Sequence, residues 1–347
     1  MDEVTLSILV VSHNQYSMLP RCLNSILEQD IKYTFEIVIS DDNSSDGTWD
    51  LICDFQKQHP SIIVATRCNS DDCNPVTISE RCGWNKLNAY LHSRGKYLVN
   101  IDADDYIRGK DIYQQQISLL EKHPMCSLCM QRTLSIQEGT DIANGVAWPS
   151  SPLLVDGNIL SFKDILQNRL RGLNQSYMMR RHSDDDMMAL YGKWFDDTII
   201  TMHYLQYGDV VFLDRADYVW VRYDTSISHS IPKLDADIVY SLLPVHHSLL
   251  IPSLRNGFIQ YGKSELCHLL KISSKVNPSE LRVDYSDYIN EFDGFIFRWI
   301  VSDKHSIWGK CRFNICRTIL RTYNILSPAS KIANSLFIFI IWHLLVK

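Results

Sequence analysis

Two short stretches near the N-terminus decide the fold class. Residues 6–12 are Leu-Ser-Ile-Leu-Val-Val-Ser, and residues 35–40 are Phe-Glu-Ile-Val-Ile-Ser. Each is a nearly continuous apolar run, which is typical of a strand buried on both faces of a parallel sheet. The order strand, helix, strand predicts an α/β fold with a parallel sheet flanked by helices. The helix is expected at residues 17–29, where one stripe carries Leu19, Cys22, Leu23, Ile26 and Leu27.

The same alternation continues along the chain. The segment 137–160 contains several Gly and Pro residues, and we expect a long loop there. From residue 232 onward the pattern is mainly helical. The other expected elements are helices at 48–58, 84–94, 109–122, 183–191 and 197–207, and strands at 61–66, 97–101, 125–136, 176–181, 209–213 and 217–223.

Composition limits the class of protein. The 347 residues are 46% hydrophobic and 21% charged, which is normal for a globular protein and excludes a disordered chain. The formal net charge of −6 argues against a nucleic-acid-binding protein. The charge is unevenly spread, because residues 304–347 contain seven Lys or Arg residues and no Asp or Glu. A basic tail on an acidic body predicts an anionic surface as its partner.

The N-terminus and the cysteines indicate a compartment. Residues 1–6 carry no basic region before the short apolar run, so we expect no signal peptide and a cytoplasmic location. The ten Cys residues are irregularly spaced, and in a reducing compartment most should be free, buried thiols.

Polar and acidic residues follow three of the predicted strands. In an open parallel sheet, ligands bind at the carboxyl ends of the strands, so these residues should converge on one edge. An alternative for residues 42–46 is that the acids only form turns and helix caps. The residues concerned are Ser12, His13 and Asn14 after the first strand, Asp41 and Asp42 after the second, and Asp102, Asp104 and Asp105 after strand 97–101.

So many carboxylates on one edge would repel one another unless a cation lies among them. Carboxylate oxygens suit the hard ions Mg²⁺ and Mn²⁺, and Mg²⁺ commonly takes further ligands from substrate phosphates. No Gly-rich phosphate loop follows the first strand, which argues against a P-loop kinase and a nicotinamide dehydrogenase. The pattern therefore predicts a nucleotide-diphosphate site with a divalent cation.

Three stretches resemble the inverting glycosyltransferases of family 2, which have the GT-A fold. They are residues 7–14 (Ser-Ile-Leu-Val-Val-Ser-His-Asn), 36–48 (Glu-Ile-Val-Ile-Ser-Asp-Asp-Asn-Ser-Ser-Asp-Gly-Thr) and 95–105 (Gly-Lys-Tyr-Leu-Val-Asn-Ile-Asp-Ala-Asp-Asp). Together they cover about the first 110 residues, and a weaker resemblance extends over 176–230. The resemblance implies a Rossmann-like, mostly parallel sheet flanked by helices.

The resemblance also implies roles for individual residues on the donor side. Asp41 would bind the base of a nucleotide-sugar donor, most often uracil, and its neighbours would line the same pocket. Lys86 could contact the nucleotide, although a solvated lysine on a helix is an equally good interpretation. The implied nucleotide-sugar-binding residues are Ser12, Asn14, Asp41, Asp42, Lys86 and Asp102, and the implied ligands of Mg²⁺ or Mn²⁺ are Asp102 and Asp104.

An inverting transfer needs a carboxylate that takes the proton of the acceptor hydroxyl. In the family this base belongs to an acidic pair that opens a helix. The matching stretch here is residues 191–198 (Tyr-Gly-Lys-Trp-Phe-Asp-Asp-Thr), in which Asp197 takes the position of the base. The alternative for Asp196 and Asp197 is an N-terminal helix cap.

These inferences divide the chain into three parts. Residues 1–230 would form the catalytic domain, with nucleotide-sugar binding in 1–110 and the acceptor side in 111–230. Residues 231–303 would be a helical region. Residues 304–347 would be a basic and apolar tail, and its terminal apolar run, 336–346, is too short to span a bilayer. Such a tail fits an anchor on an anionic membrane surface, or alternatively a terminal helix packed on the protein.

The sequence therefore predicts a metal-dependent, hexosyltransferase-class enzyme that lies on the inner face of the cell membrane. It would transfer a sugar to a saccharide hydroxyl in bacterial surface polysaccharide synthesis, with a lipid-linked acceptor as one option. Two other functions remain open. One is a sugar-nucleotide nucleotidylyltransferase, which would need a Gly- and Arg-rich loop after the first strand. The other is an inactive relative that acts as a binding module.

Overall fold

A computed structural model describes residues 3–74, 78–168, 170, 174–191, 195 and 197–224. The chain divides into two compact units, Met1–Ile227 and Ser228–Lys347, and all described residues lie in the first. The predicted helical region 231–303 and the predicted tail 304–347 lie outside the described residues.

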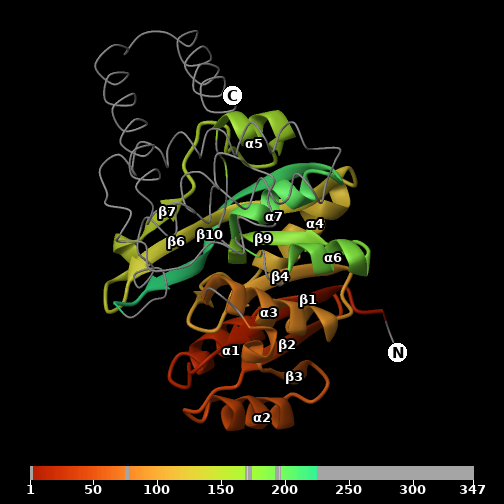
Figure 1. Cartoon of the computed structure of the whole chain (residues 1–347). Coiled ribbons are helices and arrows are strands. Elements are labelled where there is room, and N and C mark those ends of the chain that lie inside the picture. Colours follow the sequence, from red (N-terminus) through yellow and green to blue (C-terminus); the bar gives the residue numbers. More distant parts are fainter. Residues whose placement is uncertain are drawn as a thin grey trace, which may run out of the picture. The chain divides into compact units, whose positions relative to one another are not determined.

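The described residues form one 10-stranded sheet with helices on both faces (Figure 1). The main path of the sheet has the order β3-β2-β1-β4-β9-β6-β10-β5, while β7 pairs with β6 and β8 pairs with β10. The strands are β1 (Leu6–Ser12), β2 (Phe35–Asp42), β3 (Ile63–Cys68), β4 (Tyr97–Asp102), β5 (Tyr106–Ile107), β6 (Cys126–Gln137), β7 (Val146–Trp148), β8 (Ile159–Leu160), β9 (Tyr177–Arg180) and β10 (Asp209–Arg222).

The helices alternate with these strands in the first half of the unit. Short 3₁₀ turns occur at η1 (Ser70–Cys73), η2 (Ile142–Asn144) and η3 (Asn174–Ser176). The α-helices are α1 (Leu19–Leu27), α2 (Thr48–Gln58), α3 (Ile78–Leu91), α4 (Ile112–Lys122), α5 (Phe162–Asn168), α6 (Asp184–Leu190) and α7 (Asp197–Tyr204).

The predicted parallel sheet is confirmed for its first four strands. β3, β2, β1 and β4 run parallel to their neighbours, and β6 and β10 are also parallel to each other. Between these two groups lies β9, which is antiparallel to both β4 and β6. β10 therefore runs in the same direction as β4. Its carboxyl end lies at the same edge of the sheet as the carboxyl ends of β1, β2 and β4.

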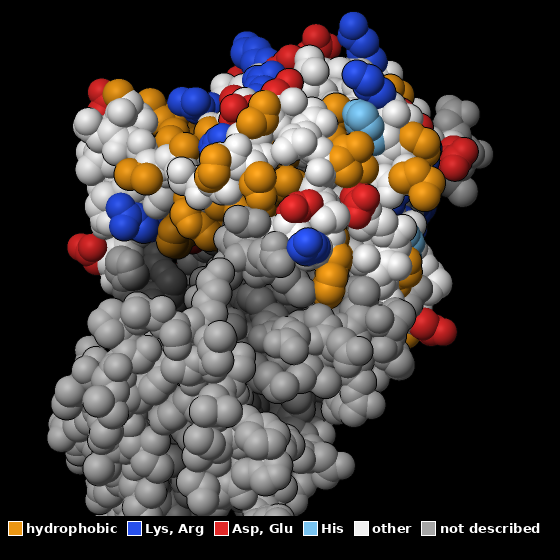
Figure 2. Space-filling view, turned by 90° about the horizontal axis from the view of Figure 1, so that it is seen from above, with side chains coloured by type: hydrophobic (Ala, Val, Ile, Leu, Met, Phe, Trp, Pro, Cys, Tyr) orange, Lys and Arg blue, Asp and Glu red, His pale blue; other side chains and the backbone are white. Residues whose placement is uncertain are grey.

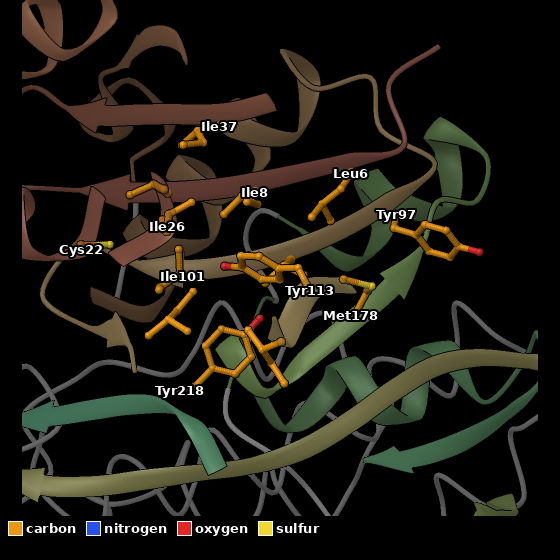
Figure 3. Close-up of a cluster of buried hydrophobic side chains, with 14 of the residues drawn as sticks. Leu6, Ile8, Cys22, Ile26, Ile37, Tyr97, Ile101, Tyr113, Met178 and Tyr218 are labelled. Carbon is orange, nitrogen blue, oxygen red and sulfur yellow. The ribbon is translucent and has the colours of Figure 1, made fainter. Parts of the chain in front are cut away.

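The core explains why β1, β2 and β4 are almost wholly apolar. Alternate residues of each strand, such as Ile8, Ile37 and Ile101, pack against α1, α2 and α4 in a single buried cluster (Figure 3). Side chains on a strand alternate between the two faces, so the intervening residues face the other way. There α3 covers the sheet, and its Asn88 donates to the Ser40 hydroxyl at 2.8 Å. Both faces are thus buried, as continuous apolar strands require.

Two segments differ from the sequence-based expectation. The segment 137–160 is not a single loop, because it contains η2, β7 and β8. The two strands expected at 209–213 and 217–223 are one strand, β10, whose register against β6 shifts between Leu213 and Tyr218. The shift accommodates the polar residues of the interruption, where Arg215 pairs with Asp111 and Asp217.

The surface seen from above carries acidic and basic side chains interspersed with hydrophobic ones in its described part (Figure 2). This mixture is typical of a globular protein surface. Within the described part of the chain, each cysteine is free, as expected, but only three of the seven, Cys22, Cys126 and Cys129, are buried, so the expectation that most are buried is wrong there. A search of the same residues finds no helix that is both long enough and apolar enough to cross a bilayer.

Candidate active site

The strand order creates a switch point beside β1. The chain passes from β1 to β2 and β3 on one side and places β4 on the other, so the carboxyl ends of β1 and β4 open a crevice where ligands of α/β sheets bind. In register, Ser12 lies opposite Asp41, and Val11 lies opposite Asp102. Ser12 is 2% exposed, and its hydroxyl has no hydrogen-bond partner within the described residues.

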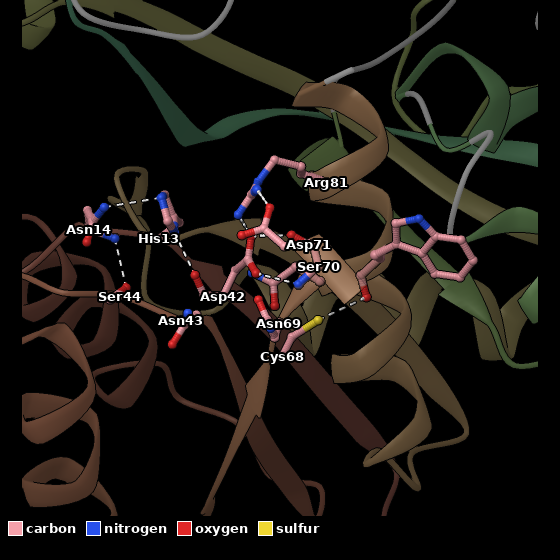
Figure 4. Close-up of polar contacts among 12 residues, drawn as sticks. His13, Asn14, Asp42, Asn43, Ser44, Cys68, Asn69, Ser70, Asp71 and Arg81 are labelled. Carbon is pink, nitrogen blue, oxygen red and sulfur yellow. Dashed lines mark hydrogen bonds and ion pairs between the residues drawn. The ribbon is translucent and has the colours of Figure 1, made fainter. Parts of the chain in front are cut away.

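Asp41 organises the turn after β2. Its carboxylate is fully buried and accepts hydrogen bonds from the Ser44 amide at 3.1 Å and the Ser44 hydroxyl at 2.5 Å. The Ser44 hydroxyl in turn accepts from the Asn14 backbone amide at 2.8 Å (Figure 4). The Asn14 side chain accepts from the Ser45 amide at 2.8 Å. Asn14 adopts a positive φ of 52°, a conformation that Asn tolerates. The predicted residues Asn14 and Asp41 therefore lie in one bonded unit.

Arg67 places a positive charge at the Asp41 carboxylate. Its Nε lies 3.6 Å from Asp41 Oδ2, and its guanidinium lies 5.0 Å from the centre of the Trp49 ring. The Arg67 side chain is 43% exposed, so it stands between the buried Asp41 carboxylate and solvent. Sequence reasoning did not select Arg67, because a lone arginine near the end of a strand carries no pattern.

Asp42 has a different set of partners from Asp41. Its carboxylate accepts from the Ser70 amide at 2.9 Å, the Ser70 hydroxyl at 2.6 Å and Arg81 Nη2 at 3.0 Å (Figure 4). Arg81 also pairs with Asp71. Asp42 thus ties β2 to the η1 turn and to α3.

Lys86 is buried rather than solvated. Its side chain is 4% exposed, and its ammonium lies 2.7 Å from Asp102 Oδ1. Burial by itself would lower the pKa of Lys86, but the neighbouring groups Asp102, Cys82 and Asp197 together outweigh burial, and the pKa is raised. Lys86 therefore stays charged. Next to it, the Asn85 amide donates to the Ser12 carbonyl at 3.2 Å, which fixes α3 over the carboxyl end of β1.

The pKa of Asp104 is raised by burial and by nearby negative charge. Burial and then the neighbouring Asp102 carboxylate raise its pKa to about 6, against partial compensation by a hydrogen bond from the Gln15 side chain. The two neighbouring carboxylates form an oxygen donor set, and a divalent cation bound there would relieve the crowding of negative charge at Asp104. The described residues hold no cluster of three or more metal-ligating side chains, but a cation bound with substrate phosphates needs only one or two carboxylates. The donor chemistry of Asp102 and Asp104 therefore fits the predicted ion.

Asp197 opens α7, as predicted, and is partly buried. Its charge contributes to the raised pKa of Lys86, so it lies within electrostatic reach of that ammonium. The ring of Phe195, two residues earlier, lies 5.2 Å from the Lys86 ammonium. The structure thus brings the predicted base to the same side chain that pairs with Asp102. Asp196 lies outside the described residues.

Arg21 and Gln15 are the main additions to the predicted site. Arg21 Nη2 donates to the Asp104 carbonyl and to the Tyr223 hydroxyl, both at 2.8 Å. Gln15 bonds the Asp104 carboxylate. Both belong to the segment directly after β1, where the sequence offered only the start of a helix as a signal.

Most of the predicted site residues lie in a part of the chain that matches a known family. Residues 7–163 match the model of the glycosyl transferase family 2. The chain carries a glycosyl transferase family 2 domain. This match contains every predicted donor-side residue from Ser12 to Asp104, whereas Asp197 lies beyond it.

Curated relatives agree with the assignment of the family 2 domain. An uncharacterized protein of Mycobacterium tuberculosis is 23% identical over 229 residues, which are 65% of this chain and 61% of that protein. A dolichyl-phosphate beta-glucosyltransferase of Dictyostelium discoideum is 27% identical over 144 residues, or 38% of this chain and 41% of the relative. The chain thus spans less than two thirds of the length of these relatives.

A solved structure confirms the predicted fold class. S. aureus TarS residues 1–349 in complex with UDP superposes with a TM-score of 0.62 at 17% identity, covering 93% of this chain and 92% of that one. The family 2 domain therefore has the predicted GT-A architecture, a mixed sheet flanked by helices.

Proposed function

We propose that this protein is an inverting, metal-dependent glycosyltransferase. It moves a sugar from a nucleoside-diphosphate donor to a hydroxyl of a saccharide acceptor. One observation carries the proposal: Asp41, Asp102 and Asp104 lie at the carboxyl ends of β2 and β4 or just after them, and Asp197 of α7 lies within electrostatic reach of Lys86, which pairs with Asp102. A binding module without activity would not need this set of carboxylates.

The donor pocket is assigned to the turn units after β1 and β2. The crevice is bordered by the turn that Asn14 and Asp41 hold and by the buried hydroxyl of Ser12, which has no hydrogen-bond partner among the described residues. Asp42 supports this wall through η1, and the exposed Arg67 is available to a nucleotide. TarS has been crystallised with UDP and with UDP-GlcNAc. On this basis, UDP is the nucleotide that we propose for the donor.

Asp102 and Asp104 would hold the Mg²⁺ or Mn²⁺ ion. When bound, such an ion would neutralise charge that develops on the departing diphosphate. Lys86 orients Asp102, because its buried ammonium bonds one oxygen of that carboxylate. Asp104 is held by Gln15 at its carboxylate and by the Arg21 side chain, which donates to its backbone carbonyl. The protein thus fixes both carboxylates before substrate arrives.

Asp197 would be the general base. It would accept the proton of the acceptor hydroxyl while that oxygen attacks the anomeric carbon from the face opposite the leaving diphosphate. The C–O bond to the diphosphate breaks as the new glycosidic bond forms, so the anomeric configuration inverts. Lys86 pairs with Asp102 and lies within electrostatic reach of Asp197, so it links the proposed base to the proposed cation site.

The acceptor is proposed at the level of chemical class. One relative is a poly(ribitol-phosphate) beta-glucosyltransferase of Bacillus spizizenii, 27% identical over 103 residues that make up 15% of that protein. Another is the dolichyl-phosphate beta-glucosyltransferase described above. These names favour a hydroxyl on a surface polymer or on a lipid-linked carrier, in keeping with a role in surface polysaccharide synthesis.

A donor screen tests the proposed function directly. The full-length protein is incubated with a panel of UDP-, GDP- and dTDP-sugars and Mn²⁺ or Mg²⁺, and release of the nucleoside diphosphate is measured. We expect slow hydrolysis of one UDP-sugar, which an appropriate acceptor accelerates. Release of inorganic pyrophosphate from a nucleoside triphosphate and a sugar phosphate would instead identify a nucleotidylyltransferase.

The basic tail gives a separate prediction about location. Each cation near an anionic leaflet contributes about 1 kcal/mol, so replacing Arg312, Arg317 and Arg321 by Gln should weaken vesicle binding by roughly 10²-fold. The measurement is cosedimentation of the full-length protein with vesicles that contain anionic lipid. The wild-type protein should bind neutral vesicles less well.

The matched control replaces three exposed cations of the described unit, Lys32, Lys57 and Lys122, by Gln. This variant should bind vesicles like the wild-type protein. Equal binding of the wild-type protein to neutral and anionic vesicles would exclude an electrostatic anchor and favour a tail that packs on the protein.

A further inference from the structure

Asp105 follows the two proposed cation ligands but has a different environment. It is 2% exposed, and both of its carboxylate oxygens are bonded within the protein. Oδ1 accepts from the Val221 amide of β10 at 3.0 Å, and Oδ2 accepts from the Gln175 side chain of η3 at 2.8 Å. One carboxylate therefore joins the turn after β4 to two segments that lie 70 and 116 residues away in the sequence.

The backbone of the same turn is bonded to two further elements, β1 and α1. The Ala103 amide donates to the Val11 carbonyl at 3.0 Å, and the Asp105 amide donates to the Asp102 carbonyl at 3.0 Å. Arg21 reaches the Asp104 carbonyl from α1. The turn that carries the Asp104 carboxylate is therefore bonded to β1 and α1 through its backbone, and to β10 and η3 through the Asp105 side chain.

The choice of a carboxylate at position 105 is energetically unfavourable by itself. A buried charge costs free energy unless it is well bonded, and here Asp102 and Asp104 add like charge nearby. Its two hydrogen bonds join this turn to the side chain of Gln175 in η3 and to the main chain of β10. Both oxygens of the Asp105 carboxylate are buried and bonded within the protein, so this side chain holds the turn in place and does not contact a ligand.

We propose that Asp105 is a positioning residue, whose carboxylate fixes the turn of Asp102 and Asp104 against β10 and η3. It acts through Asp104 and sets where that carboxylate meets the cation and the diphosphate of the donor. The proposal rests on the proposed function, since it concerns the same donor site. It assigns Gln175 as the partner that holds the Asp105 side chain in place.

An exchange of the two side chains tests this assignment. Gln175→Glu places two carboxylates against each other and should displace the turn. Adding Asp105→Asn restores a hydrogen bond, with the amide now on residue 105 and the carboxylate on residue 175, and Oδ1 still accepts from Val221. Asp105→Ala removes both bonds.

The readouts are the affinity for UDP with Mn²⁺, measured by calorimetry, and the KM and kcat for the donor found in the screen. Asp105→Ala and Gln175→Glu should each weaken UDP binding at least about tenfold and raise the donor KM. The double variant should recover to within about threefold of the wild-type protein. A purely structural effect would lower the melting temperature without this pattern of loss and recovery.

Glu36→Ala is the matched control. Glu36 is equally buried, at 2% exposure, and accepts from the Ser7 hydroxyl at 2.7 Å and from Arg94. It lies at the opposite end of β2 from the site, so its loss should lower stability and leave UDP affinity within about twofold. This variant shows how much affinity follows from stability alone.

Three outcomes overturn the proposal. Unchanged UDP affinity in Asp105→Ala would show that the turn holds its place without this carboxylate. Failure of the double variant to recover relative to Gln175→Glu would show that the charge of Asp105 acts directly. If the wild-type protein binds no nucleoside diphosphate, the proposed function fails and this inference fails with it. Should Asp105→Ala not fold, the comparison of Gln175→Glu with the double variant decides.

Discussion

Asp104→Asn should abolish detectable binding of UDP at millimolar Mn²⁺ and reduce transfer by at least roughly 10²-fold, because one of two proposed cation ligands is lost. The neighbouring carboxylate of Asp102 is already bonded to Lys86, so it cannot replace Asp104. Calorimetric titration of UDP with and without Mn²⁺ measures the first effect, and nucleoside-diphosphate release measures the second. Full turnover of the wild-type protein in EDTA would contradict the metal requirement.

The same substitution should not destabilise the protein, which separates loss of binding from loss of fold. The pKa of Asp104 is raised to about 6 by burial and by Asp102, so folding disfavours its charged form. The stabilising contribution of protonated Asp104 is therefore lost as the pH rises from about 4 to about 6, on the order of 1–3 kcal/mol. Asp104→Asn lacks this group and should melt no lower than the wild-type protein at pH 8 without metal. Asp54→Asn, at an exposed position, should leave UDP binding unchanged.

The sequence predicted the strands that are buried on both faces. β1, β2 and β4 begin and end within about two residues of the expected positions, because a continuous apolar run bounded by polar residues is a local signal. β7 and β8 were missed within 137–160. They contain three and two residues, and they form only because β6 and β10 offer partners for pairing. Such strands depend on tertiary contacts that a local pattern does not contain.

In the candidate site, too, residues marked by a local sequence pattern could be predicted, whereas contacts between distant residues could not. Asp41 and Asn14 could be selected because each follows a predicted strand directly. Lys86 could not be distinguished from a solvated lysine, since the helix pattern does not show that this face meets Asp102. The bond between Asp105 and Gln175 joins residues 70 positions apart, and neither residue alone indicates it. Strand ends are thus predictable from sequence, whereas the contacts that position them follow from the order of the sheet.

Asp197→Asn should retain UDP binding and lose transfer by roughly 10²–10⁴-fold, because only the proton-accepting group is removed. The base contacts the acceptor hydroxyl and not the diphosphate, so the substitution should lower kcat with little change in the donor KM. Steady-state transfer to the acceptor and calorimetry with UDP and Mn²⁺ measure the two effects on the same preparation. This separation distinguishes Asp197 from Asp104, whose loss should affect binding first.

A cap is the competing interpretation of Asp197, because it is the first residue of α7. An Asn in its place caps a helix about as well as Asp, so a cap alone predicts nearly unchanged stability and nearly unchanged transfer. Asp185→Asn, at an exposed position in α6, provides the control for removal of one negative charge near this region. Transfer by Asp197→Asn at a rate near that of the wild-type protein would show that another group takes the proton. A loss confined to Asp197→Asn, with the melting temperature unchanged, is the result that the proximity of Asp197 to Lys86 and Asp102 leads us to expect.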